Sequence, residues 1–339
     1  MDDKQLNTVD DKPLVMVWVG PDEMNRGDTQ GMIGLARNCA RLVNGRFICL
    51  DDDVVTQMFS KTTLYKDRIK AALKKYGAPD MLFGRYSTEV YDQMRVKPRL
   101  FVHDINETIS LSRDFNRYVA HDITPNKLKD KAVEFYSHYP DIKGPLLGVF
   151  IGGSNCQLNN DGRDIAKKIY YLAARHDEAT IFLCPSRRSK QDYARLYEHL
   201  QTGFSSWFDD GSLSVNFRKA IGRAPNVHIM GEDYLDMLGG YNPYVGLMGA
   251  ADHLFVIGDS FSIACETMAV GKPVYMDFMY RYYDDLVDSG HIIPIHKIGS
   301  TKLTKYTVPP VNMTTEIAKV LVDEYKASCA RQTKEPKSP

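Results

Sequence analysis

The sequence has no excess of charge of either sign. Lysine and arginine together number 43, and aspartate and glutamate also number 43, so the formal net charge of the 339-residue chain is zero. A domain that coats DNA or RNA is usually plainly basic, so we expect no nucleic-acid partner. Hydrophobic residues make up 43% of the chain and charged residues 25%. This is ordinary globular composition, which excludes a largely disordered, collagen-like or coiled-coil protein.

The sequence also lacks paired cysteines and long apolar runs. None of the six cysteines stands in a C-x-x-C spacing, which argues for reduced, mostly buried thiols rather than disulfides or a zinc cluster. Residues 1–12 are acidic and polar, with no apolar signal segment, and we expect them to be disordered. No apolar run approaches the ~18 residues of a membrane span. We therefore predict a cytoplasmic protein, either free or peripheral at the inner membrane face.

Several common ligand motifs are missing. The sequence contains no G-x-G-x-x-G, no H-E-x-x-H and no G-x-S-x-G. The P-loop spacing fails at Gly271-Lys272, because Pro273 follows and Glu266 stands where the first glycine should be. No histidine and cysteine ligand cluster is present either, so we expect neither a bound metal nor a separate cofactor.

Strand-length apolar runs alternate with helical patterns along the chain, which is typical of parallel α/β sheets. Before residue 139 we predict strands at 14–19, 46–50, 81–83, 100–103 and 118–120, with helices at 32–42, 62–76 and 126–136. Tyr139–Pro145 holds two prolines and a glycine, which mark a hinge. The pattern then restarts, with strands at 146–151, 179–184, 227–230, 253–257 and 274–276 and helices at 163–174, 190–200, 244–250, 261–269 and 314–329.

This pattern predicts two Rossmann-like domains, at 13–138 and 146–312, with parallel sheets facing a central ligand cleft. We expect the tail at 330–339 to be disordered.

Three turns of the second domain suit an anion. Gly152-Gly153-Ser154 follows a strand, and its backbone N–H groups either hold phosphate or form an ordinary tight turn. Ser186-Arg187-Arg188 follows the next strand, and its arginines either bind a diphosphate or begin a solvated helix.

The third turn belongs to a longer run of motifs, namely Asn242-Pro243-Tyr244, Gly258-Asp259-Ser260, Ser262, Glu266 and Gly271-Lys272-Pro273. Asp259 or Ser260 can cap the helix that follows, and the N-terminus of that helix attracts anions. Glu266 either accepts the hydroxyls of a ribose or is a surface acid. Three such turns on successive strand ends favour a ligand site.

The stretch from Asn242 to Val274 resembles the C-terminal signature of GT-B glycosyltransferases. It is most similar to the mitochondrial-fission "elongated mitochondria" family, and the order and rough spacing of motifs agree over residues 146–276. In the N-terminal half, Gly27 and Gly34-Leu35-Ala36 fit the family. Asp28, however, stands where the family has histidine, and Gly31 where it has glutamine.

The resemblance implies a metal-independent glycosyltransferase, transferring a hexosyl or N-acetylhexosaminyl group. The C-terminal domain would bind a nucleoside-diphosphate sugar, with Gly153, Ser154, Arg187 and Ser260 at the diphosphate and Glu266 at the ribose. The N-terminal domain would bind an unknown acceptor, lipid-linked or protein, and the last helix would cross back onto it. Asp28 is our first choice of base. His103 and His121 are the other candidates, each followed by an Asp, and each such pair is alternatively a capping Asp beside a surface His.

Three rival functions remain open. They are a nucleotide-sugar epimerase of the same fold, a non-catalytic membrane-remodelling or scaffold protein, and a periplasmic-type ligand-binding protein, which also has two lobes but for which we would expect an export signal. The segment from Lys61 to Lys75 bears on the second. Its only acid is Asp67, against six basic residues, namely Lys61, Lys66, Arg68, Lys70, Lys74 and Lys75. Such a helix either contacts anionic lipid or a phosphorylated acceptor, or is a solvated face.

Overall fold

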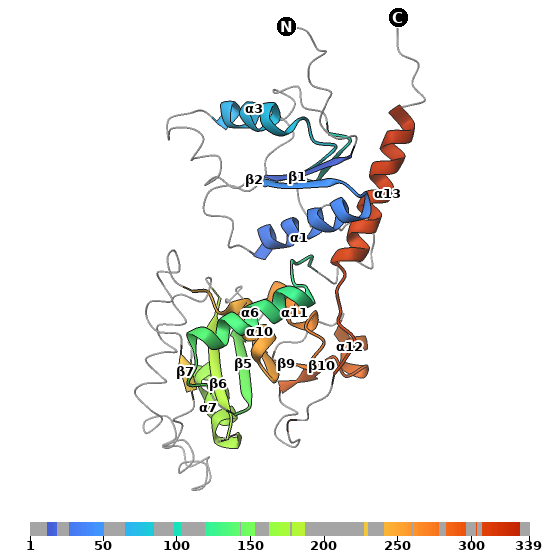
Figure 1. Ribbon diagram of the computed structural model, residues 1–339. Helices are drawn as coiled ribbons and strands as arrows, with labels where there is room; N and C mark the ends of the chain where they lie inside the picture. Colours follow the sequence, from blue (N-terminus) through green and yellow to red (C-terminus); the bar gives the residue numbers. More distant parts are fainter. Residues whose placement is uncertain are drawn as a thin grey trace, which may run out of the picture. The chain divides into compact units, whose positions relative to one another are not determined.

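The computed structural model describes residues 12–18, 27–50, 65–84, 98–102, 119–142, 144–152, 163–176, 178–186, 227–229, 241–258, 260–277, 283–295, 303 and 307–332. The chain divides into two compact units (Figure 1). One comprises Met1–Asp122 with Asn312–Pro339, and the other Ile123–Val311. Among the described residues each unit has one sheet, and every strand pairing found there is parallel. The predicted α/β class with two parallel sheets is thereby confirmed.

The sheet of the first unit has the strand order β2-β1-β3-β4. Its strands are β1 (Leu14–Trp18), β2 (Arg46–Leu50), β3 (Met81–Gly84) and β4 (Leu100–Val102). All five residues of β1 are buried, because helices cover both faces of the sheet. Val15 and Val17 belong to the core on one face, whereas Leu14 and Met16 belong to the core on the other. This is why β1 is apolar without alternation.

In the described part of this unit, the sheet is covered by helices from before and after the second unit in the chain. Helix α3 (Tyr65–Tyr76) lies on one face, where Ala72 is buried while Lys74 and Lys75 are exposed. Helices α1 (Gly27–Leu42) and α13 (Thr314–Gln332) pack against each other on the opposite face (Figure 1).

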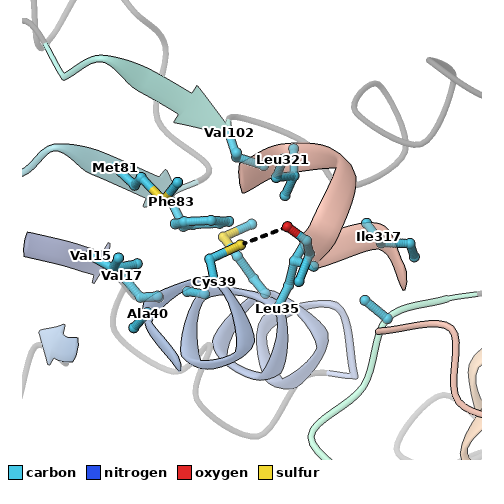
Figure 2. Close-up of a cluster of buried hydrophobic side chains, with 14 of the residues drawn as sticks. Val15, Val17, Leu35, Cys39, Ala40, Met81, Phe83, Val102, Ile317 and Leu321 are labelled. Atoms are coloured by element: carbon cyan, nitrogen blue, oxygen red, sulfur yellow. Dashed lines mark hydrogen bonds between the residues drawn. The ribbon is translucent and has the colours of Figure 1, made fainter. Parts of the chain in front are cut away.

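Figure 2 shows the core between α1, α13 and the sheet, where the Cys39 thiol contacts the Ala318 carbonyl oxygen at 3.7 Å. Burial raises the pKa of Cys39 to about 12, so this thiol remains protonated at neutral pH.

The sheet of the second unit has the strand order β7-β6-β5-β8-β9-β10. Its strands are β5 (Leu146–Ile151), β6 (Thr180–Pro185), β7 (Val227–Ile229), β8 (His253–Ile257), β9 (Val274–Met276) and β10 (Ile292–Pro294). Counted along the chain from β5, this order is 3-2-1-4-5-6, the doubly wound Rossmann arrangement. The winding reverses between β5 and β8, and ligands of such sheets bind outside the carboxyl ends of the strands at that point.

Helices cover both faces of this second sheet. Helix α7 (Arg163–Arg175) buries Ile165 and Ile169 against one face. On the other face, α10 (Tyr244–Ala250) packs closely on α6 (Pro125–His138), and the Phe135 ring contacts Phe182 with centroids 5.1 Å apart. Two further helices, α11 (Phe261–Met268) and α12 (Asp284–Asp288), follow β8 and β9.

The structure differs from the sequence prediction at the unit boundary. The chain changes unit between Asp122 and Ile123, not at Tyr139–Pro145. The reason is α6, which begins at the Thr124 cap and packs on α10, so it belongs to the second unit. The proposed hinge therefore lies within that unit, between α6 and β5.

Three secondary-structure predictions also need correction. The segment 119–120 is not a strand, and β9 is not the last strand because β10 pairs with it. Helix α12 was not predicted. The predicted helix at 190–200 lies outside the described residues. None of the helices in the described ranges combines the length and apolarity that crossing a bilayer requires.

Candidate functional site

Two glycines hold the strand ends together where the winding of the second sheet reverses. Gly152 follows β5, and its N–H donates to the Ile257 carbonyl oxygen of β8 at 2.7 Å. Gly258 follows β8 with a φ of +94°, a conformation that favours glycine. A Cβ atom on Gly152 would lie 2.8 Å from Ser260 Cβ and 2.9 Å from Ser260 N. Glycine is therefore required at both turns, because the backbones approach each other closely.

Ser260 begins α11 directly at this junction. It is the N-cap of the helix, buried to 5% exposure, and its Oγ accepts from the Ile263 N–H at 3.5 Å. The first-turn N–H groups of a helix carry a partial positive charge that attracts anions. Of the two caps that the sequence allowed, Ser260 is the one observed, and Asp259 lies outside the described residues.

The second predicted turn lies at the neighbouring strand end. The Ser186 N–H, just after β6, donates to the Ile151 carbonyl oxygen at 2.8 Å. Gly152, Ser186 and Gly258 thus occupy the carboxyl ends of three adjacent strands, as the sequence predicted for one sheet edge. The other residues predicted for these turns lie outside the described residues, namely Gly153, Ser154, Arg187 and Arg188.

Glu266 is buried rather than a surface acid. It retains 8% exposure within α11, and its Oε2 accepts a hydrogen bond from the Tyr244 hydroxyl. Ser262, in the first turn of the same helix, is half-buried. A buried carboxylate needs hydrogen-bond donors, since burying an unpartnered charge is costly. Tyr244 is one such donor, and it is not among the residues that the sequence predicted for the site.

Asn242 acts on the backbone at the start of α10. It is exposed, and its Oδ1 accepts from the Tyr244 N–H at 3.0 Å, which is the local turn that Asn side chains favour. The Tyr244 ring lies edge-on to Phe150 of β5, with centroids 5.5 Å apart. The Asn-Pro-Tyr motif therefore joins α10, β5 and α11.

Lys272 anchors the other end of α10. Its Nζ donates to the carbonyl oxygens of Gly249 at 3.2 Å and Ala251 at 2.5 Å. The last carbonyl groups of a helix lack partners within the helix, and a lysine there stabilises them. The Gly-Lys-Pro motif thus contributes a helix cap in this structure.

Replacing Lys272 by methionine should lower the free energy of unfolding by about 1–2 kcal/mol, because two carbonyl groups lose a charged donor. Urea unfolding measures this. The matched control is Lys319→Met, which removes an exposed pair with Glu316 in α13 and should cost at most about 0.5 kcal/mol. Similar losses in the two variants would contradict the capping role.

The candidate bases belong to the first unit. His121 is buried at 3% exposure, and its backbone N–H and C=O both pair with the Thr314 hydroxyl, at 3.0 and 3.1 Å. Asp122 is also buried and forms an ion pair with Arg37 of α1. The pair of a capping Asp and a surface His that the sequence offered as the alternative is therefore not what the structure contains at 121–122.

Asp28 lies in the first turn of α1. The same helix contacts His121 two turns later, since a Cβ on Gly34 would lie 2.4 Å from the His121 carbonyl oxygen. His103 lies outside the described residues. Among the described residues there is no group of three His, Cys, Asp or Glu side chains placed to hold a metal ion.

A family model described as Mitochondrial fission ELM1 matches residues 210–325. The match includes α10, β8, α11 and β9, and it confirms the family resemblance that the sequence motifs indicated. An uncharacterized protein of Rickettsia prowazekii, RP120, is 21% identical over 204 residues, which are 58% of this chain. The matched part is 51% of that relative, so this chain spans about half the length of the curated protein that it matches.

Solved structures show the fold. The UDP-GlcNAc 2-epimerase of Methanocaldococcus jannaschii aligns with a TM-score of 0.50 at 12% identity, covering 91% of this chain and 98% of that one. A glycosyl transferase family 9 protein of Veillonella parvula aligns with a TM-score of 0.45 at 11% identity, covering 95% and 98%. The two parallel sheets, together with the alignment to the epimerase, show the GT-B fold class that was predicted.

Proposed function

From the match to the Mitochondrial fission ELM1 family and the GT-B fold, we propose that the second unit binds a nucleoside-diphosphate sugar. One observation carries the proposal. Gly152, Gly258 and Ser260 bring two strand ends and a helix N-terminus together at the point where the sheet winding reverses. Sheets of this topology bind nucleotides at this place. A similar fold is found in an enzyme named for UDP-GlcNAc.

The diphosphate would lie against the N-terminus of α11. The small residues there let backbone N–H groups approach the phosphate oxygens, and the helix dipole favours negative charge. Gly153, Ser154, Arg187 and Arg188 would complete this site, since the paired arginines suit a diphosphate. Glu266, further along α11, would accept the ribose hydroxyls.

We propose glycosyl transfer as the reaction. An acceptor oxygen would attack the anomeric carbon of the sugar while the bond from that carbon to the phosphate oxygen breaks. The leaving nucleoside diphosphate gains negative charge, and the arginines and the α11 N-terminus would stabilise it without a metal. The first unit would supply the acceptor base. Asp28 suits this role better than His121, because the buried His121 has little surface to offer an acceptor.

Isothermal titration of the full chain with nucleoside diphosphates, in the presence of a metal chelator, tests the donor site. We expect at least one of them to bind and to raise the melting temperature, since a ligand of the folded state stabilises it. If none of the common nucleoside diphosphates or their sugars binds, the proposal is wrong.

Product analysis then separates the rival functions. A transferase should release nucleoside diphosphate from the sugar donor only when an acceptor is present. An epimerase would convert the donor alone without accumulating free nucleotide, and a scaffold protein would bind without turnover.

Replacing Glu266 by alanine should weaken ribonucleotide binding about 10- to 100-fold, the scale of a lost hydrogen bond to a charged group. The 2′,3′-dideoxy analogue should bind nearly as before, because it lacks the hydroxyls that Glu266 would accept. Calorimetry of both ligands measures the difference, and Glu316→Ala, an exposed acid of α13, is the control. Equal losses for the two ligands would mean that Glu266 does not contact the ribose.

A further inference from the structure

We propose that Tyr244 is a positioning residue that holds the Glu266 carboxylate for the ribose. This inference rests on the proposed nucleotide site, and it assigns the tyrosine of the Asn-Pro-Tyr motif a part in ribose selectivity. The contact that carries it joins two helices, since the Tyr244 hydroxyl comes from α10 and donates to Oε2 of Glu266 in α11.

The surroundings of Glu266 explain why it needs such a partner. Every residue from Ile263 to Met268 in α11 is buried, and Glu266 is the one charged side chain among them. An ionised carboxylate in that position is stabilised by donors, and a hydrogen bond that involves an ionised group is stronger than a neutral one. The Tyr244 hydroxyl supplies one such donor to Oε2 of Glu266.

Tyr244 is itself held in place from several sides. Its ring lies edge-on to the Phe150 ring, at an interplanar angle of 89°, and its backbone N–H donates to Asn242 Oδ1. Helix α10 is fixed at its far end by Lys272 and along its side by Gly249, where a Cβ would lie 2.3 Å from the Leu128 carbonyl oxygen. The donor thus reaches Glu266 from a rigid helix rather than from a loop.

A fixed donor on one oxygen restrains the rotation of the whole carboxylate. A carboxylate has about four lone-pair positions on its two oxygens. The bond from Tyr244 uses one of them and fixes the orientation of the carboxylate, so the other positions can accept ribose hydroxyls in defined directions. Such preorganisation favours a ligand with two neighbouring hydroxyls over one with none. Tyr244 would thereby raise selectivity for ribonucleotides without contacting the ligand.

The test is Tyr244→Phe, which removes the hydroxyl and keeps the ring against Phe150. The probes are the nucleoside diphosphate that the unmodified protein binds and its 2′,3′-dideoxy analogue, measured by calorimetry. We expect the ribonucleotide affinity to fall about tenfold and the analogue affinity to stay unchanged. In a protein that already carries Glu266→Ala, adding Tyr244→Phe should cause no further loss of ribonucleotide affinity, since Tyr244 would act through Glu266.

The matched control is Tyr136→Phe, which removes another tyrosine hydroxyl of the same unit, one that donates to the Ala250 carbonyl oxygen at 3.4 Å. It should leave both affinities unchanged. Equal losses for the two ligands in Tyr244→Phe would show a merely structural role and overturn the inference. Tighter ribonucleotide binding would also overturn it, because the hydroxyl would then occupy the place of a ribose hydroxyl. If the unmodified protein binds no nucleotide, the donor-site proposal itself fails, and that result is seen before any variant is made.

Discussion

Replacing Gly152 by alanine is expected to weaken nucleotide binding by the second unit about 10- to 100-fold. The new Cβ would lie 2.8 Å from Ser260 Cβ and 2.9 Å from Ser260 N, so the N-terminus of α11 must move away from the end of β5. Overpacking of this kind typically costs about 1–3 kcal/mol. The displaced groups are those proposed to hold the diphosphate, so this cost should appear in binding, where about 1.4 kcal/mol corresponds to a tenfold change in affinity.

Titration calorimetry with the nucleoside diphosphate measures this loss, and Gly144→Ala provides the control. Gly144 lies just before the amino end of the same strand, where it has a φ of +77° and where its Cβ would lie 2.9 Å from the Glu178 carbonyl oxygen. That variant should lose some stability and keep its affinity. Unchanged affinity in Gly152→Ala would place the nucleotide elsewhere.

Replacing Gly34 by alanine is expected to destabilise the first unit by about 3 kcal/mol, at the upper end of overpacking effects. Helix propensity alone predicts the opposite sign, because alanine stabilises a helix interior by about 1 kcal/mol relative to glycine. At Gly34, however, a Cβ would lie 2.4 Å from the His121 carbonyl oxygen and 2.9 Å from Asp122 Cα. These are backbone atoms, and Thr314 holds the His121 backbone on both its N–H and C=O.

Urea unfolding of Gly34→Ala, monitored with a spectroscopic probe in the first unit, shows directly whether the substitution lowers or raises the free energy of unfolding. Gly34→Val should destabilise more than Gly34→Ala, since the clash grows with side-chain volume. A stabilised Gly34→Ala would mean that the segment at 121–122 can move away from α1, and that the glycine is not required by this contact.

The sequence predicted the sheets well because their central strands are buried on both faces. β1, β5 and β8 are short, largely apolar runs that end at or just before a glycine, and such runs are hard to misread as loops. The turns after β5, β6 and β8 were also predictable, since adjacent parallel strands bring their carboxyl ends to one edge.

The contact between Tyr244 and Glu266 could not be predicted in the same way. The two residues are 22 positions apart, and they meet only because α10 and α11 flank β8 in the folded unit. The Asn-Pro-Tyr motif contains Tyr244, but Asn242 was the residue of that turn predicted for the site. The sequence feature that could have indicated this contact was the hydroxyl of Tyr244 in an otherwise apolar helix, since a tyrosine hydroxyl in such a place usually has a hydrogen-bond partner.

The unit boundary was misplaced for a related reason. Composition marked Tyr139–Pro145 as a linker, whereas packing decides which unit a helix joins. Gly246 and Gly249 stand three residues apart in α10, and at both positions a Cβ would collide with α6, at 2.7 Å from the Lys131 carbonyl oxygen and 2.3 Å from that of Leu128. Small residues at that spacing indicate two helices in close contact, and they were the sequence feature that could have placed α6 correctly.

Because α13 belongs to the first unit, the two units can complete their folding only in a certain order during synthesis. The sheet and α1 of that unit leave the ribosome first, but Ile317, Ala318 and Leu321, which complete their core, follow only after all of Ile123–Val311 has been made. At about 5–20 residues per second, the face of α1 that receives α13 stays uncovered for roughly ten to forty seconds. The second unit, whose residues are contiguous in the chain, can close during that interval. We therefore expect the nascent first unit to depend on chaperones until the last helix emerges.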